Sequence, residues 1–200
     1  GLLIADEMIS RVGRTGKLFG VEYDGVLPDI MTLGKGMGGG FPVSALISTD
    51  EIVAAKPFSL PSASSSSYGG NPLAAAAVRV TLDTILDENL VENSHRVGSW
   101  ILEELESWKP NYSFMGRLQG RGLMIGLDLV RDKTSGEPWS ADACGELFHN
   151  GLRDGIILMI SSSALRINPA LTITRNEASL ALEKMKHLFE EAEEKKLFLR

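Results

Sequence analysis

The stretch from Pro28 to Pro42 constrains this chain more than any other, because an apolar run there ends at a single lysine, Lys35. Five glycines lie between Gly34 and Gly40, on both sides of that lysine. Lysine is normally a surface residue, and glycine removes the side chains that would keep a ligand away from the backbone. The pattern therefore predicts a turn at the end of a strand in which Lys35 faces a bulky ligand.

Three chemistries place a lysine in a glycine-rich turn. A Walker phosphate loop needs glycine five positions before the Gly-Lys pair and Ser or Thr after it, but Asp29 and Gly36 stand there. The spacing from Gly34 to Gly39 matches a dinucleotide fingerprint, but the segment that follows is extended instead of helical. The third chemistry is a Schiff base between Lys35 and a cofactor aldehyde, which needs a deprotonated amine. A solvated loop lysine is the alternative.

Asp6 supports the Schiff-base interpretation. The apolar run Leu2–Ala5 is typical of a strand buried in a parallel sheet, and Ile30–Leu33 predicts a second one. If these strands are neighbours, Asp6 and Lys35 face one crevice at their carboxyl ends. An aspartate beside a protonated pyridine nitrogen keeps a pyridoxal ring cationic, so that the ring can accept carbanion electrons. The alternative is an aspartate that caps the next segment.

A serine-rich loop predicts an anion site. Ser66, Ser67 and Gly70 come shortly before Asn71 and Pro72, and Asn at the N-cap with Pro at the first helical position marks a helix start. Free backbone amides and the helix dipole favour phosphate at such a place. A flexible serine linker is the alternative.

Arg166 is a candidate for binding a substrate carboxylate. It lies inside the apolar segment Ala164–Asn168, where an arginine normally needs a partner. Its guanidinium could hold a carboxylate through two parallel hydrogen bonds. An internal ion pair with one of the 26 acidic residues is the alternative, and Arg14, Arg117 and Arg121 are weaker candidates of the same kind.

The remaining pattern predicts an α/β part followed by an α+β part, with a boundary between residues 105 and 106. Apolar spacing and capping residues mark most of the elements. The expected strands cover 42–48, 123–130, 156–160 and 165–168, and the expected helices cover 50–55, 72–86, 90–108, 141–152 and 175–192, the last opened by a capping box of Thr174 and Glu177.

Composition excludes several classes of function. The net charge is −6 without a basic block, which argues against nucleic acid as a partner. Cys144 is the only cysteine, so a reducing compartment such as the cytoplasm is expected, and the thiol is expected to pack in a helix core. No apolar stretch reaches the roughly 20 residues that span a bilayer. The three histidines lack metal-ligand spacing, so no metal site is expected. The chain opens directly on an apolar run without methionine, and we expect it to be a fragment of a longer protein.

Taken in order, these stretches resemble the class-III pyridoxal-phosphate-dependent aminotransferases, in particular the ω-amino acid, acetylornithine and 4-aminobutyrate group. No single motif is specific, but the ordered set is. The resemblance covers the C-terminal half of the family and rests on Ile4–Glu7, Gly13–Gly16, Pro28–Ile30, Gly34–Gly40, Tyr68–Leu73, Arg121–Met124 and Arg166–Leu171.

The resemblance implies the type I fold of pyridoxal-phosphate-dependent transferases. Residues 1–105 would form the C-terminal part of a large domain with a mostly parallel sheet, and residues 106–200 an α+β small domain. Lys35 would be the Schiff-base lysine that moves the substrate proton, Asp6 the partner of the pyridine nitrogen, and Met8 the residue that packs against the ring. Ser67, beside Ser66, would reach the phosphate of a cofactor in a neighbouring subunit, which implies a homodimer with shared active sites. Arg166 would hold the substrate α-carboxylate.

The implied reaction moves an amino group from an amino acid or ω-amine donor to a 2-oxo acid. Racemisation, aminomutase chemistry and decarboxylation on the same fold are alternatives, as is a catalytically incomplete fragment. Two residues depart from the family pattern. Ile9 replaces a frequent Gln, which favours the ω-aminotransferase branch, and Arg11 stands where glycine is usual. The glycine-serine phosphate loop and the ring-stacking aromatic residue of the family's N-terminal half are not part of this sequence.

Overall fold

The computed structural model describes residues 1–63 and 65–199, so that Ser64 of the serine-rich loop lies outside the described residues. Packing divides the chain into two compact units, Gly1–Glu92 and Asn93–Arg200, which we call the large-domain unit and the small-domain unit. The division falls in the first turn of a long helix, earlier than the boundary at residue 105. The reason is that Val97, Ile101 and Leu105 of this helix are buried in the core of the small-domain unit.

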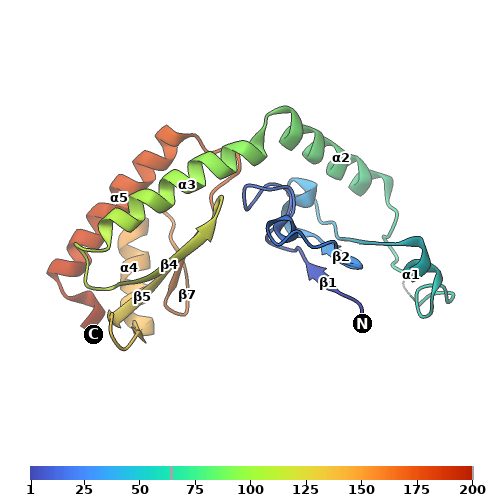
Figure 1. Cartoon of the computed structure of the whole chain (residues 1–200). Coiled ribbons are helices and arrows are strands. Elements are labelled where there is room, and N and C mark those ends of the chain that lie inside the picture. The colour runs from blue at the N-terminus through green and yellow to red at the C-terminus, as the bar shows by residue number, and fades with distance from the viewer. Residues whose placement is uncertain (64, 200) are drawn as a thin grey trace. The chain divides into compact units, whose positions relative to one another are not determined.

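The large-domain unit carries a three-stranded sheet in the order β1 (Ile4–Asp6), β2 (Ile30–Leu33) and β3 (Ala45–Ser48), shown in Figure 1. The β1–β2 pair is parallel and the β2–β3 pair is antiparallel. Two 3-10 turns follow the first two strands, η1 (Gly20–Tyr23) and η2 (Lys35–Gly38), and the helices are α1 (Asp50–Ala54) and α2 (Pro72–Asp87). The sequence predicted the three strands in order, but β1 and β3 each begin later than expected.

The helix starts follow the predicted capping residues. The Asn71 side chain accepts hydrogen bonds from the Leu73 and Ala74 amides at the start of α2, at 2.8 and 3.1 Å. Ser140 caps α4 (Ala141–Arg153), and Thr174 forms the capping box of α5 (Arg175–Glu194) with Glu177. These caps are predictable because they join residues only two or three positions apart.

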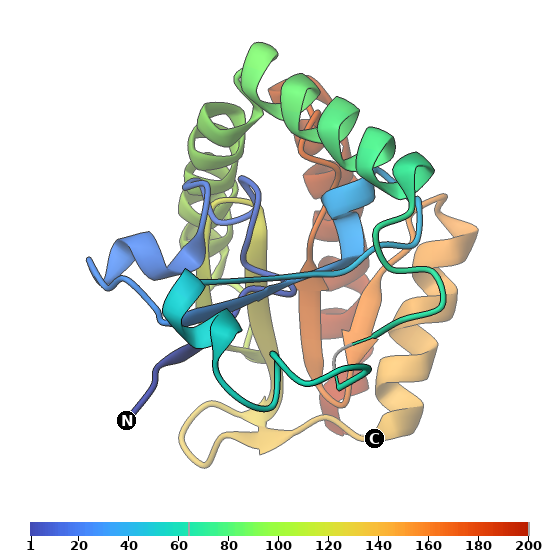
Figure 2. The ribbon, with the colours of Figure 1, turned by 90° about the vertical axis from the view of Figure 1, so that its right-hand side faces the viewer.

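The small-domain unit is an antiparallel sheet covered on one side by α3 (Leu90–Trp108), α4 and α5, as Figures 1 and 2 show. The strand order is β4 (Met115–Arg121), β5 (Met124–Asp132), β8 (Ala164–Ile167) and β7 (Met159–Ser161); β6 (Glu137–Pro138) pairs with β5, and η3 (Leu197–Leu199) ends the described chain. Along β5 the buried Ile125, Leu127 and Leu129 alternate with half-buried residues that include Gly126 and Asp128. Such alternation places one face of the sheet on the core and leaves the other more exposed.

Three sequence predictions for the small-domain unit were wrong or incomplete. Strand β4 was missed, because Gly116 and Gly120 interrupt its pattern and a register irregularity between Met115 and Leu118 breaks its alternation. Strand β6 was not among the expected strands. Strand β7 begins at Met159, so that most of the apolar run from Ile156 to Ile160 precedes the strand. Cys144 is buried on α4 as expected, and its burial raises the pKa of the thiol.

Candidate active site

The carboxyl ends of β1 and β2 bring Asp6 and Lys35 to the same edge of one sheet. The two strands are parallel neighbours, which meets the condition stated from the sequence, and Asp6 lies opposite Thr32 in the register. Lys35 follows the end of β2 by two positions and opens the η2 turn. Because parallel strands present their carboxyl ends at one edge, this edge is where a ligand of an open α/β sheet is expected.

Only one of the two carboxylate oxygens of Asp6 accepts hydrogen bonds from the described residues. Its Oδ1 accepts a hydrogen bond from the Met8 amide at 3.1 Å and one from the Thr32 hydroxyl at 3.2 Å. Among the described residues Oδ2 has no hydrogen-bond partner, and the side chain is exposed. An ionised carboxylate with one free oxygen can accept a further N–H donor.

Met8 packs against the glycine that precedes Lys35. A Cβ atom at Gly34 would lie 2.6 Å from the Met8 sulfur, which is shorter than any real contact of that kind. Glycine is therefore required at position 34 for Met8 to occupy this place, so the loop after β1 packs against the residue that precedes Lys35.

The backbone at Lys35 has a φ of 44°, in the left-handed region that L side chains rarely adopt. Non-glycine residues in this region cluster at functional sites, because the surrounding structure must hold them there. Here Gly39 closes the turn with a φ of 59°, and a Cβ at Gly39 would come within 2.8 Å of the Thr81 hydroxyl of α2. The Lys35 side chain is exposed, and it makes no hydrogen bond or ion pair with another described residue.

The loop after β1 is anchored by a buried carboxylate, which the sequence analysis did not single out. Glu7 is only 2% exposed, and it accepts hydrogen bonds from the Ser10 hydroxyl at 2.5 Å and from the Gly20 and Val21 amides at 3.0 and 2.8 Å. The Glu7 amide in turn donates to the Thr32 carbonyl of β2. Glu7, which directly follows β1, therefore ties the far end of the loop from residue 8 to residue 19 to the end of that strand.

Arg11, which replaces the usual glycine, is buried in this loop. Its Nη1 donates to the Met8 carbonyl at 2.5 Å and approaches the Glu7 carbonyl at 3.5 Å. Burial lowers the pKa of the guanidinium, and the nearby Glu7 carboxylate opposes that effect. Arg11 therefore stabilises the backbone at Met8 through this hydrogen bond.

Ser66 lies in the serine-rich loop that precedes α2. It lines a cavity of about 640 Å³ together with Pro42–Ser44, Tyr68–Asn71, Ala74 and Ala75. Its hydroxyl accepts a hydrogen bond from the Tyr68 amide at 3.3 Å, and both Ser66 and the neighbouring Ser67 are exposed. The Leu73 and Ala74 amides are already bonded to Asn71, so an anion here would be bound by hydroxyl groups and the helix dipole rather than by those amides.

Arg166 lies on β8 of the small-domain unit, opposite Gly126 on one side and Met159 on the other. It is half-buried, and it has no hydrogen bond or ion pair within residues 1–63 and 65–199. The alternative of an internal ion pair therefore finds no support in the described chain. A Cβ at Gly126 would meet nothing within 4 Å, so there is open space at the position opposite Arg166 in the sheet.

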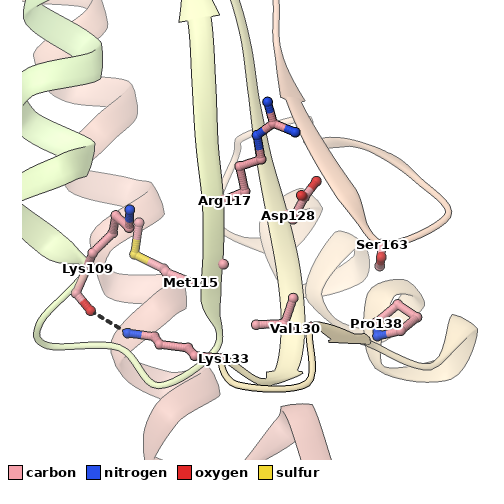
Figure 3. Close-up of a pocket in the computed structure, with 10 residues that line it drawn as sticks. Lys109, Met115, Arg117, Asp128, Val130, Lys133, Pro138 and Ser163 are labelled. Atoms are coloured by element: carbon pink, nitrogen blue, oxygen red, sulfur yellow. Dashed lines mark hydrogen bonds between the residues drawn. The ribbon is translucent and has the colours of Figure 1, made fainter.

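The small-domain unit contains a further cavity of about 650 Å³, shown in Figure 3, which is lined by Arg117, one of the weaker carboxylate-binding candidates, and by none of the other predicted site residues. Arg117 and Asp128 line it together with two lysines. The Lys133 ammonium donates to the Lys109 carbonyl at 2.7 Å, and Lys109 pairs with Glu106 at 3.0 Å. Both lysines are thus engaged by the chain itself. In the part of the chain that the structure describes, no group of three acidic, histidine or cysteine side chains is placed to bind a metal.

Comparison with known proteins shows the family. Residues 1–189 match the family described as aminotransferase class-III. The chain belongs to this family. It is 37% identical to human mitochondrial alanine–glyoxylate aminotransferase 2 over 187 residues, which cover 92% of this chain and 36% of that protein. It is 34% identical to a leucine/methionine racemase of Thermococcus litoralis over 194 residues, or 96% of this chain and 43% of the racemase.

Solved transaminases have the same fold. A thermostable (S)-enantioselective omega-transaminase from Thermomicrobium roseum superposes with a TM-score of 0.85 at 33% identity, over 95% of this chain and 43% of that one. The predicted family and a partial type I fold are thereby confirmed. The chain spans less than half the length of these relatives.

Proposed function

We propose that this chain carries the lysine-bearing half of a pyridoxal-phosphate-dependent transaminase. One observation carries the proposal: the parallel β1–β2 pair brings Asp6 and the strained Lys35 to one edge of the sheet. A lysine and an aspartate at that edge are the two groups that a pyridoxal ring needs from the protein. Membership of the class-III family supports the same conclusion.

The residues present fit the cofactor. Asp6 has a free Oδ2 to accept the N–H of a protonated pyridine ring, and Lys35 has an exposed amine without a partner among the described residues. Met8 offers an apolar surface beside Gly34 for the ring. When bound, pyridoxal phosphate supplies an aldehyde that links to amines and a ring that takes up electrons.

Each residue then has a defined task in transamination. The Lys35 amine would hold the cofactor through its aldehyde and would carry the proton that leaves the substrate Cα. Asp6 would accept the N–H of the pyridine ring through its free Oδ2. Arg166 binds the substrate carboxylate, with room beside it over Gly126. The donor is an amino acid or an ω-amine and the acceptor a 2-oxo acid, and the apolar Ile9 favours the ω-aminotransferase branch.

Ser67 supports a homodimer with shared sites. It is exposed in the loop before α2, where its hydroxyl is available to the phosphate of a cofactor bound in a second subunit. We expect the dimer to act in the cytoplasm. No helix in the described part of the chain combines the length and the apolar character needed to cross a membrane.

The test is Lys35→Ala in the full-length gene product that contains this sequence. We expect loss of the visible absorption band of the lysine-bound cofactor and turnover at least about a hundredfold lower, the lower end of what positioned proton transfer contributes. Lys186→Ala, an exposed lysine on α5, serves as control and should leave both unchanged. Turnover at the wild-type rate in the Lys35 variant would exclude the proposal.

Racemisation is the second candidate, because a leucine/methionine racemase is among the relatives. It uses the same removal of the Cα proton but returns the proton to the opposite face. Exchange of the Cα hydrogen with solvent deuterium without release of a 2-oxo acid would favour racemisation. Stoichiometric formation of the 2-oxo acid favours transamination.

A further inference from the structure

We propose that Thr32 is a positioning residue of this site, which holds the Asp6 carboxylate in the orientation that the pyridine nitrogen requires. The inference rests on the proposed function. It concerns a residue in the middle of β2 that lies beside the aspartate and not beside the lysine.

The geometry places the Thr32 hydroxyl directly on the carboxylate. Asp6 and Thr32 are opposite each other in the parallel register of β1 and β2, the two strands labelled in Figure 1. The hydroxyl donates to Asp6 Oδ1 at 3.2 Å, and the Met8 amide donates to the same oxygen at 3.1 Å. Two donors on Oδ1 fix the carboxylate plane and leave Oδ2 as the acceptor for a further N–H group.

No other described group can take over this task. Asp6 is the last residue of a three-residue strand, it is exposed, and it has no ion pair within the described ranges. Thr32 is therefore the only side chain of the described residues that donates to this carboxylate, since the second donor is a backbone amide. A hydrogen bond to a charged acceptor is stronger than one between neutral groups, so its loss changes the orientation of Asp6 measurably.

The hydroxyl has no competing structural duty. Thr32 contributes to the sheet through its backbone, because its carbonyl accepts the Glu7 amide at 3.0 Å. Valine has the same shape and the same preference for strands, and only the hydroxyl is lost on replacement. Thr32→Val therefore removes the hydrogen bond to Asp6 while it leaves the strand intact.

The experiment uses the full-length gene product. It compares three single variants, Thr32→Val, Thr32→Ser and Asp6→Asn, and the double variant that combines Thr32→Val with Asp6→Asn. Three quantities are measured: the dissociation constant of pyridoxal phosphate, the visible absorption band of the bound cofactor with its pH dependence, and the Tm of the cofactor-free protein. Thr84→Val is the matched control, because this threonine is exposed on α2 and its hydroxyl bonds only to the Val80 carbonyl.

We expect Thr32→Val to weaken cofactor binding by about tenfold, which corresponds to about 1.4 kcal/mol, and to shift the band or its pH dependence. The Tm of the cofactor-free protein should stay at the wild-type value, and Thr32→Ser should restore both cofactor properties. In the Asp6→Asn background Thr32→Val should have no further effect, because the two residues act as one unit.

Two outcomes would overturn the inference: wild-type affinity and spectrum in Thr32→Val, or equal losses in Thr32→Val and in the Thr84→Val control. If Thr32→Val lowers the Tm, Thr32→Ser decides, since a serine that fails to restore the spectrum contradicts a role for the hydroxyl. If the wild-type protein itself binds no pyridoxal phosphate, the proposed function fails. If wild type binds and Thr32→Val behaves like it, only the role of Thr32 fails.

Discussion

The two units of this chain bury their apolar residues very differently. The small-domain unit has one continuous core, in which Phe114, Leu127, Leu165 and Phe189 are fully buried. The large-domain unit leaves Leu2, Leu3, Ile4, Leu46 and Ile47 exposed on its strands or beside them, and Leu27 is 93% exposed. The comparison shows that the small-domain unit closes its apolar core within the described residues, whereas the large-domain unit does not.

In the small-domain unit, hydrophobic packing is sufficient to define the fold. In the large-domain unit, the residues of the candidate site are placed by polar contacts: Glu7 ties down a loop, and Thr32 and the Met8 amide hold Asp6. The chemistry thus lies in the unit that has the smaller core. Two predictions test this comparison, and two more test the packing and the helix capping of the small-domain unit.

The largest expected effect concerns the two units expressed separately. Residues 93–200 should unfold cooperatively in urea, whereas residues 1–92 should show no cooperative transition, because they lack a closed core. All three tryptophans, Trp100, Trp108 and Trp139, lie in the small-domain unit, so tryptophan fluorescence reports on this unit alone. Circular dichroism reports on the other. A cooperative transition of the 1–92 segment would contradict the comparison.

The second prediction concerns core packing. Phe114 is fully buried and lies 5.0 Å from Trp139 and 5.1 Å from Phe189, measured between ring centroids. Phe114→Ala should lower the free energy of unfolding of the small-domain unit by about 3–5 kcal/mol. Leu27→Ala in the large-domain unit should change the stability of the 200-residue chain by less than about 0.5 kcal/mol. Urea titrations followed by fluorescence and circular dichroism measure both, and similar losses in the two variants would refute the contrast.

The third prediction compares two glycines of the small-domain unit. A Cβ at Gly98 of α3 would lie 1.9 Å from the Gly122 carbonyl oxygen, whereas a Cβ at Gly126 would meet nothing within 4 Å. Gly98→Ala should destabilise the unit by about 1–3 kcal/mol or more, because α3 must move away from the sheet. Gly126→Ala should leave the Tm near the wild-type value. A Gly98 variant with unchanged Tm would show that α3 is packed loosely.

The smallest expected effect is the pH dependence of the α5 capping box. The Thr174 amide and hydroxyl both donate to the Glu177 carboxylate at 2.8 Å, and these hydrogen bonds lower the pKa of Glu177. A lowered pKa in the folded state means that this stabilisation is present above the pKa of the unfolded chain and is lost as the pH falls through the folded value. Glu177→Gln should therefore be less stable than wild type at neutral pH and converge with it in acid.

Thermal unfolding at a series of pH values measures this difference. Glu183→Gln is the control, because Glu183 is exposed on the same helix and takes no part in the capping box of Thr174 and Glu177. If the difference in Tm between Glu177→Gln and wild type stays constant across the pH range, the capping box is not its source.

Local patterns predicted much of the fold and part of the site. Asn71, Ser140 and Thr174 marked their helices correctly, and α3 begins and ends at the residues that its apolar stripe predicted. Strand β4 was not predictable in the same way, since its pairing with β5 and not its own pattern makes it a strand.

Several features of the site required the tertiary structure. The sequence shows Asp6 and Lys35 at the ends of two apolar runs, but only the register of β1 and β2 makes Thr32 the partner of Asp6. The one hydroxyl in the apolar run Ile30–Leu33 was the signal that could have drawn attention to Thr32. Nothing in the sequence marked the buried carboxylate of Glu7 as the anchor of η1, because its partners lie 13 and 14 positions away.

By itself the sequence determined the family, the helix caps and the lysine in its glycine turn, because each depends on residues that are close together along the chain. Only the tertiary structure decided which oxygen of Asp6 is free and that Arg166 has no partner among the described acidic residues. It also decided that one unit closes a core while the other leaves apolar side chains exposed. These properties depend on strand register and burial, which join residues far apart in the chain.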